Sequence, residues 1–307
     1  MQDKNRIKTK RWAYLAGLVD GDGSFSIRRN SVAGFQLTLY VYSTNRNMMT
    51  WLERVFGGQH RKMPTEGNRK QKYCWYSNDA STIRNVSPFL VVKVAQGQTA
   101  CQFLDLESDR NPSARQDLMS DLQSQNTYFS PLPAKEIVKA TLHQTPTKND
   151  FAYLAGLFDA EGSFSIWQKA KRGNGEFESL ARISNTDGRI FPWLYARFQG
   201  NYCVTLREDR DEGTWKMNGP NRENNTLAII PYLVIKRERA IIFLEWMRNV
   251  RTYPRETKLL KCEIMRKLNL RGLSPTTNTA NGPENGLKIE SELYGDMQSE
   301  PVVTLAS

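Results

Sequence analysis

Apolar and polar positions alternate in a way that predicts the same order of helices and strands twice along the chain. In the first half an apolar helix is followed by two strands of period two, an amphipathic helix, a hairpin and two further helices. These elements are expected at residues 11–20, 24–29, 35–44, 45–56 and 58–78, with the last two helices starting at about 79 and 95. The second half repeats this order from residue 150. The pattern therefore predicts an α+β protein with two similar halves.

Two pairs of matching segments set the register between the halves. The stretch YLAGLVDGDGSF at residues 14–25 returns as YLAGLFDAEGSF at 153–164, an offset of 139, and SPFLVVK at 87–93 returns as IPYLVIK at 230–236, an offset of 143. Offsets this similar over whole halves indicate an internal duplication. The expected domains are a first half at 1–126, a linker at 127–149, a second half at 150–272 and a disordered tail at 273–307, where Ser, Thr, Asn, Gly and Pro dominate.

The charge is strongly basic and unevenly distributed. The 307 residues include 43 Lys and Arg against 32 Asp and Glu, a net charge of +11. Residues 273–307 carry five acids and one base, so residues 1–272 carry +15. A basic folded part favours a polyanionic partner, with nucleic acid before an anionic membrane surface.

Several function classes are disfavoured by composition. The four cysteines lie far apart and form no CxxC pair, and the two histidines have no partner at metal-ligand spacing, so zinc sites and disulfide frameworks are not expected. No apolar run approaches the roughly 20 residues that cross a bilayer. The basic start of the chain resembles a signal peptide only briefly, because its short apolar part runs directly into Asp20. We therefore expect no secretion and no membrane span, with the intracellular compartment left open.

The repeated motif predicts two helices that pack side by side. Small residues stand four apart on one face of each helix, where they allow backbones to approach closely; they are Gly17 and Gly21 in the first copy and Gly156 and Ala160 in the second. The alternative is two independent core helices. Parallel packing would bring Asp22 and Glu161 together just past two helix ends, each of which carries partial negative charge. Carboxylate and carbonyl oxygens in such a cluster suit Mg²⁺, which accepts phosphate oxygens.

The motifs LAGLVDGDGSF and LAGLFDAEGSF resemble the signature of the LAGLIDADG homing endonucleases, in the single-chain form with two motifs. The resemblance covers roughly residues 11–272. It implies an αββαββα fold in each half, related by a pseudo-twofold axis, with two antiparallel sheets that form a DNA-binding saddle. It also implies a monomer, usually intron-encoded, that cleaves both strands of double-stranded DNA with Mg²⁺ or another divalent cation such as Mn²⁺.

The resemblance assigns roles residue by residue. It implies that Asp22 and Glu161 bind metal, with the carbonyls of Gly21 and Ala160 beside them, while Asp20 and Asp159 are structural. By position, Asn45 and Asp187 would orient water, although Asp187 departs from the Gln or Asn usual there, and Asn45 could equally be a helix N-cap. Lys93 and Lys236 would stabilise charge on the phosphate or polarise the attacking water, the alternative being ordinary surface lysines.

Polar and basic side chains at period two predict the faces that would contact DNA. A solvated sheet face has the same alternation, so the prediction rests on the whole set. In the first half the set is Ser24, Ser26, Arg28, Gln36, Thr38, Tyr40, Tyr42, Arg61, Arg69, Lys70 and Lys72. In the second half it is Ser163, Ser165, Trp167, Arg182, Ser184, Arg207, Arg210, Lys216 and Asn218.

The leading hypothesis is a site-specific DNA endonuclease with a long, asymmetric target, because two unequal half-sites are built into one chain. One alternative is a group I intron maturase, which would bind intron RNA on the same fold. Another is a catalytically inactive DNA-binding protein. Retention of an acid at the end of both motifs favours the nuclease.

Overall fold

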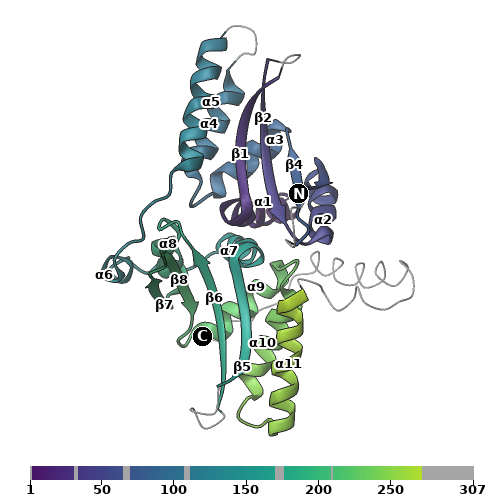
Figure 1. Cartoon of the computed structure of the whole chain (residues 1–307), viewed down its shortest axis with the longest axis vertical. Helices are drawn as coiled ribbons and strands as arrows, with labels where there is room; N and C mark the ends of the chain where they lie inside the picture. Colours follow the sequence, from purple (N-terminus) through teal and green to yellow (C-terminus); the bar gives the residue numbers. More distant parts are fainter. Residues whose placement is uncertain are drawn as a thin grey trace, which may run out of the picture.

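The first half of the chain forms one antiparallel sheet with helices around it (Figure 1). The computed structural model describes residues 2–30, 34–64, 70–106, 111–169, 176–208 and 210–271. The sheet has the strand order β1-β2-β4-β3. The elements are α1 (Gln2–Asp22), β1 (Gly23–Asn30), β2 (Gly34–Ser43), α2 (Arg46–Phe56), β3 (Gln59–Lys62), β4 (Tyr73–Ser77), α3 (Ala80–Val86), a short 3-10 helix (Ser87–Phe89), α4 (Val94–Asp105) and α5 (Pro112–Thr127).

The second half repeats this arrangement with the strand order β5-β6-β8-β7. Its elements are α7 (Lys148–Glu161), β5 (Gly162–Gln168), β6 (Phe177–Asn185), α8 (Ile190–Phe198), β7 (Asn201–Thr205), β8 (Glu212–Met217), α9 (Arg222–Ile229), a 3-10 helix (Ile230–Tyr232), α10 (Arg237–Asn249) and α11 (Arg255–Arg271). The predicted α+β class and the two antiparallel sheets are confirmed.

The connection between the halves is partly helical. It contains α6 (Lys135–Lys139), and α7 begins at Lys148, inside the segment expected to be a linker. Thr147 caps α7 in a reciprocal capping box with Asp150, which explains the early start of this helix. The expected disorder of residues 273–307 lies outside the described residues.

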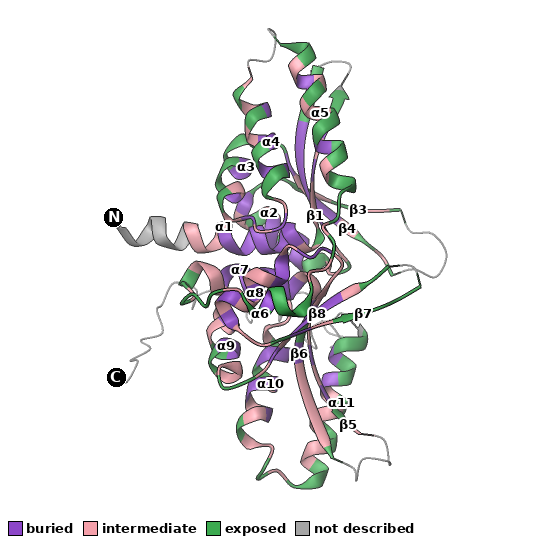
Figure 2. Ribbon diagram, turned by 90° about the vertical axis from the view of Figure 1, so that its left-hand side faces the viewer, coloured by how far each residue is buried: buried purple, intermediate pink, exposed green. Residues whose placement is uncertain are grey.

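The two motif helices α1 and α7 pack against each other at the centre of the molecule, where Figure 2 shows a continuous run of buried residues. A Cβ on Gly17 would lie 2.1 Å from the carbonyl oxygen of Tyr153, and one on Gly156 would lie 2.0 Å from that of Tyr14. Neither distance is compatible with a side chain. The glycines therefore allow the two backbones to approach far more closely than ordinary helices, which lie about 8–10 Å apart.

The duplication extends to the helices α5 and α11, which cover the edge strands β1 and β5. The side-chain amide of Asn126 on α5 donates to the carbonyl of Phe25 at 2.8 Å, and that of Asn269 on α11 donates to the carbonyl of Phe164 at 2.9 Å. These bonds pair strand carbonyls that an edge would otherwise leave open. They also hold α5 and α11 beside the ends of the motif helices.

Candidate active site

Two buried carboxylates lock the motif helices to the rest of each half. Asp20 accepts hydrogen bonds from the backbone N–H groups of residues 91–93 at 2.7–3.0 Å, and Asp159 accepts them from residues 234–236 at 2.7–3.1 Å. Each also accepts a tyrosine hydroxyl from the opposite helix: Tyr153 donates to Asp20 at 2.6 Å and Tyr14 to Asp159 at 2.7 Å. These bonds tie the end of each motif helix to the segment that follows the 3-10 helix of the same half and to the opposite motif helix, which is a structural arrangement.

The two predicted lysines lie at the C-terminal ends of these helices. Lys93 Nζ donates to the carbonyls of Val19 and Asp20 at 2.8 and 2.7 Å. Lys236 Nζ donates to residues 158–160 at 2.6, 2.9 and 3.3 Å. Burial lowers the pKa of both amines, that of Lys236 to about 8, and the nearby carboxylates oppose the shift. The positive ends of the lysines offset the negative helix ends, so the local negative charge is smaller than the motif alone suggested.

Asp22 and Glu161 end their helices, and Asp22 lies close enough to raise the pKa of Glu161. Desolvation, followed by repulsion from Asp22, raises the pKa of Glu161 to about 7, while Lys236 and Lys93 oppose the rise. Desolvation also raises the pKa of Asp22, and the same lysines oppose it. The sites of the two halves are therefore joined electrostatically. Two carboxylates that are costly to ionise together gain from a bound cation.

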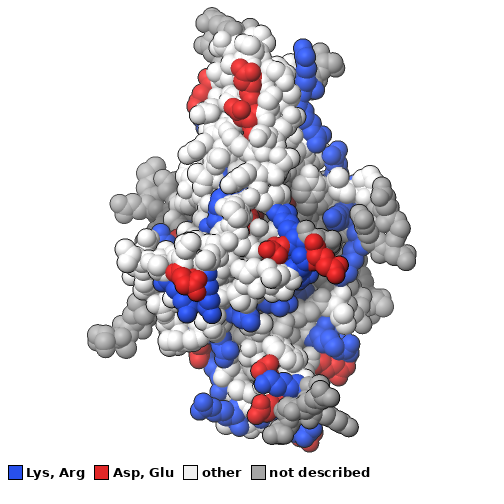
Figure 3. Space-filling view, turned by 60° about the vertical axis from the view of Figure 1, so that its left-hand side comes forward, with Lys and Arg blue, Asp and Glu red and all other residues white. Residues whose placement is uncertain are grey.

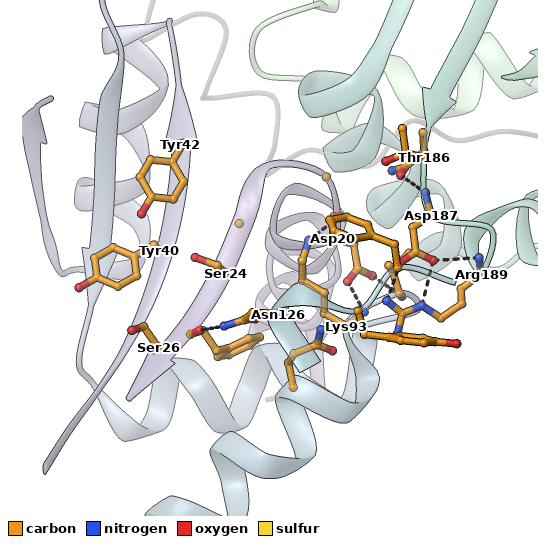
Figure 4. Close-up of a pocket in the computed structure, with 18 of the residues that line it drawn as sticks. Asp20, Ser24, Ser26, Tyr40, Tyr42, Lys93, Asn126, Thr186, Asp187 and Arg189 are labelled. Carbon is orange, nitrogen blue, oxygen red and sulfur yellow. Dashed lines mark hydrogen bonds and ion pairs between the residues drawn. The ribbon is translucent and has the colours of Figure 1, made fainter. Parts of the chain in front are cut away.

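A cavity of about 490 Å³ opens beside these groups. Lys93, Glu161 and Asp187 all line it, together with Gly21 and Arg189. Figure 4 shows Asp20 and Lys93 between two walls, one carrying Tyr40, Tyr42, Ser24 and Ser26 and the other carrying Thr186, Asp187 and Arg189. The cavity thus brings residues from both halves together, with a basic amine beside a carboxylate and a row of hydroxyl groups.

The residues expected to orient water occupy matching positions but have different partners. Asn45 caps α2, since its side chain accepts the N–H of Met48 at 3.1 Å. Asp187 is buried, and the guanidinium of Arg189 lowers its pKa despite the burial. The N-cap alternative for Asn45 is therefore correct as local structure, and Asp187 is an ion-paired acid. Neither arrangement tests a role toward water.

The donor set fits a divalent cation in part. The Gly21 carbonyl lies next to Asp22 in the chain and lines the cavity with Glu161, whereas the Ala160 carbonyl accepts a hydrogen bond from Lys236 at 3.3 Å. Among the described residues no group of three His, Cys, Asp or Glu side chains could hold a metal. Two carboxylates and a carbonyl would leave the remaining coordination positions of a cation to water and phosphate oxygens. Mg²⁺ is commonly bound in this way, because it keeps several water molecules and takes only one or two carboxylates from the protein.

Solved structures with this arrangement of helices and sheets include endonucleases bound to DNA. The LAGLIDADG meganuclease I-AabMI bound to uncleaved DNA matches with a TM-score of 0.58 at 15% identity, over 83% of this chain and 98% of that one. I-SmaMI bound to uncleaved DNA target in the presence of calcium ions matches with a TM-score of 0.54 at 16% identity, over 84% of this chain and 97% of that one. The LAGLIDADG homing endonuclease I-LtrWI bound to target DNA matches with a TM-score of 0.55 at 14% identity, over 85% of this chain and 98% of that one.

This chain has the LAGLIDADG endonuclease fold. The resemblance read from the two motifs is thereby confirmed at the level of the fold. No protein-family model and no curated protein matches the sequence. Among the described helices, none is long and apolar enough to cross a membrane.

The first sheet of this LAGLIDADG fold presents most of the predicted polar residues on one face. In the register, Ser24 lies opposite Tyr40, Ser26 opposite Thr38 and Arg28 opposite Gln36, so all share that face. Thr38 and Tyr40 differ from expectation, because they are 5% and 7% exposed. The guanidinium of Arg28 lies 5.5 Å from the Tyr40 ring, and long side chains thus cover this face in the free protein. Arg69 lies outside the described residues.

The second sheet presents a comparable face, and both faces contain residues beyond the predicted set. Ser163 lies opposite Arg182, which lies opposite Lys216, while Ser184 lies opposite Thr214. The register adds Gln59 and Tyr76 in the first sheet and Leu180, Asn201 and Thr214 in the second. Gln59, Tyr76, Asn201 and Thr214 follow from the pairing of the strands β3, β4, β7 and β8, whereas Leu180 alternates with Arg182 and Ser184 within β6. Figure 3 shows Lys and Arg side chains over both halves of one side of the molecule, with fewer acids among them.

Proposed function

We propose that this protein is a site-specific endonuclease that cleaves both strands of double-stranded DNA with the help of a divalent cation. The observation that carries the proposal is the pairing of Asp22 and Glu161 at the ends of two adjacent helices, with Lys93 beside them in a cavity reached from the polar sheet face. The DNA-bound neighbours of the same fold support it. The +15 charge of residues 1–272 suits a phosphate backbone.

In this proposal each group has a separate task. Asp22, Glu161 and the Gly21 carbonyl hold Mg²⁺ or Mn²⁺, which would polarise phosphate and activate water. Lys93 and Lys236 keep positive charge beside the phosphate while fixing the ends of α1 and α7. Two such sites, one at the C-terminal end of each motif helix, would each act on one strand. Unequal halves would accept unequal half-sites, so the target would be asymmetric.

Strand-resolved cleavage tests the proposal. A target duplex is selected from a randomised library by binding to the wild-type protein, labelled on both strands and incubated with Mg²⁺. We expect both strands to be cut, and Asp22→Asn or Glu161→Gln to slow at least one strand about a hundredfold or more, since a metal supplies several kcal/mol of transition-state stabilisation.

Asp121→Asn is the matched control, because Asp121 is an exposed acid on α5 that is not among the residues lining the cavity. It should cut at the wild-type rate. Tight binding of the selected duplex without cleavage of either strand would defeat the nuclease proposal. Full cleavage by both Asp22→Asn and Glu161→Gln would show that the metal ligands lie elsewhere. The intron-RNA alternative gains no support from the DNA-bound neighbours.

A further inference from the structure

One row of side chains crosses each sheet at matching positions, but the two rows differ in chemistry. Each row begins one residue after the glycine that starts the first strand of its half. In the second sheet the register gives the row Ser163, Arg182, Lys216 and Asn201. In the first sheet it gives the row Ser24, Tyr40, Tyr76 and Gln59. Two cations therefore occupy the positions that two tyrosines occupy in the other half.

The tyrosine row of the first sheet is stabilised by contacts within the protein. Tyr40 and Tyr76 lie directly opposite each other, with ring centres 6.2 Å apart. The guanidinium of Arg28 lies 5.5 Å from the ring centre of Tyr40, and that of Arg61 lies 5.6 Å from that of Tyr76. The Tyr76 hydroxyl donates to Gln59 at 2.6 Å. Aromatic pairs across strands stabilise a sheet, so this row contributes to the stability of the free protein.

The matching pair of the second sheet has the opposite effect. Arg182 and Lys216 lie directly opposite each other, and like charges in such a pair destabilise a sheet. Among the described residues neither cation makes an ion pair, because Glu178 and Glu212 on the same face pair with other basic residues. The Nε of Arg182 donates to Ser163 Oγ at 3.3 Å, which orients the guanidinium. A local cost without compensation in the free protein is expected at a binding site.

Both cations project from the polar face of the sheet. The strand neighbours of Arg182 are Ala181 and Ile183, which are fully buried, and Lys216 likewise lies between two buried residues. Because successive side chains point to opposite faces of a strand, both cations point away from the core. Arg182 is exposed and Lys216 is half-buried. In the major groove guanine presents two acceptors, O6 and N7, for which Arg and Lys are the usual partners.

We propose that Arg182 and Lys216 read guanine, through its O6 and N7 atoms, in the half of the target that the second sheet contacts. The inference rests on the DNA-binding part of the proposed function and not on cleavage. Ser163, at the start of the row, follows Glu161 by only about 7 Å of extended chain. The guanine is therefore expected close to the centre of the target and not at its end.

Selection of duplexes from a randomised library, by binding to each protein without divalent cation, locates the guanine. We expect the wild-type protein to select guanine at one or more positions in one half-site, and Arg182→Gln to lose that preference and keep the others. Lys148→Gln is the matched control, because Lys148 is an exposed cation about 20 Å along α7 from Glu161. It should keep every base preference of the wild type.

Chemical changes to the selected guanine then test the contact at the level of atoms. Replacement of the guanine by adenine should raise the Kd of the wild type by about 5- to 150-fold, the range of a good two-point contact, and that of Arg182→Gln by less than about twofold. Replacement by 7-deazaguanine, which removes N7 and leaves the phosphates unchanged, should weaken the wild type and leave Arg182→Gln unaffected. Arg182→Lys should discriminate less than the wild type, because it keeps the charge and loses the planar fork.

The outcomes separate guanine reading from a phosphate contact and from cleavage. Retention of the guanine preference by Arg182→Gln would overturn the inference. If the variant keeps the preference and its slope of log Kd against log salt falls by about 1, Arg182 binds a phosphate instead. A wild-type protein that distinguishes guanine from 7-deazaguanine but cuts neither strand with Mg²⁺ would leave guanine reading standing and defeat the nuclease function.

A second variant separates base reading from a structural role of the pair. Arg182→Tyr with Lys216→Tyr recreates the tyrosine pair of the first sheet and removes the like charges. It should fold, melt at or above the wild-type temperature and lose the guanine preference. A folded double variant that still selects guanine would overturn the inference. So would an Arg182→Gln variant that melts at a lower temperature and keeps the wild-type base preferences.

Discussion

At the scale of single residues, the difference between Asp22 and Glu161 has a geometric counterpart in the helix contact. A Cβ on Gly21 would lie 2.4 Å from Ala160 Cβ and 3.2 Å from Glu161 Cγ. The Cγ methylene of Glu161 therefore lies close to Gly21, and a side chain at position 21 would meet Ala160 first and would also crowd Glu161. Gly21 of the first motif and Glu161 of the second motif therefore fit each other. A larger residue at position 21 would require Ala160 and Glu161 to shift.

The raised pKa of Glu161 predicts a pH-dependent effect on stability in metal-free protein. Between the ordinary pKa of 4.5 and about 7 the folded protein holds a proton that the unfolded chain has lost, so folding stability falls as pH rises through this window. Glu161→Gln has no such penalty. We expect the variant to be more stable than the wild type at pH 8 by about 1–2 kcal/mol, discounted for partial exposure, and equal to it near pH 4.

Denaturant unfolding at both pH values, with a chelator present, measures this difference. Added Mg²⁺ should then stabilise the wild type at pH 8 and leave Glu161→Gln little changed, because a ligand that binds only the folded state raises its stability. A variant that is less stable than the wild type at pH 8 without metal would show that the two lysines outweigh burial and stabilise the ionised carboxylate of Glu161.

At the scale of elements, the contact between α1 and α7 depends on small residues that face each other in two different ways. Gly17 faces backbone atoms of α7, whereas Gly21 faces mainly the Cβ of Ala160. We expect Gly21→Ala to destabilise the protein by about 1–3 kcal/mol through overpacking, and Ala160→Gly to restore most of that loss in the double variant. Denaturant unfolding of the four proteins gives the coupling energy.

Gly17→Ala is the matched comparison. Its Cβ would meet the carbonyl oxygen of Tyr153 at 2.1 Å, and no change at residue 160 removes a backbone atom. Ala160→Gly should therefore fail to rescue it. Additive losses for Gly21→Ala with Ala160→Gly would contradict the contact described for these two positions.

The elements could be predicted wherever a local pattern determines them. Period-two alternation located β1, β2, β5 and β6, and Asn45 with its apolar partners located α2. The polar start of α1 and the whole of α11 have no clear apolar stripe, so α1 begins at Gln2 rather than at residue 11 and α11 was not singled out. Their positions depend on packing against other elements, as the bond from Asn269 to Phe164 shows.

The acidic residues of the candidate site could be predicted from the sequence, whereas most of the contacts around them could not. The duplication placed Asp22 beside Glu161, because the small residues of both helices had to meet. The bonds from residues 91–93 to Asp20 join positions more than 70 residues apart in sequence, which no local spacing reveals. The ion pair between Arg189 and Asp187 was not predicted, because this segment is positioned by the connection at Ser130 and Pro131, which lies far from it in the sequence.

At the scale of the whole molecule, the two halves share one interior. Tyr14 of the first half completes the bonds to Asp159, and Tyr153 of the second half completes those to Asp20. Separation of the halves would leave each buried carboxylate one donor short and expose both glycine faces. The loss of a hydrogen bond to a buried charge costs about 1.5–3 kcal/mol, so neither half is expected to keep its structure when the other unfolds.

This coupling predicts a single unfolding transition for both halves. Phe243 is fully buried in the second half, and Phe243→Ala should cost about 3–5 kcal/mol there. Hydrogen exchange should then accelerate by the same factor in the most protected amides of both sheets, including those of β2, which does not contact α10 closely. The midpoint should not depend on protein concentration, because the helix pair is completed within one chain. Acceleration confined to the second sheet, or a midpoint that rises with concentration, would show instead that the halves are independent or that the stable unit contains more than one chain.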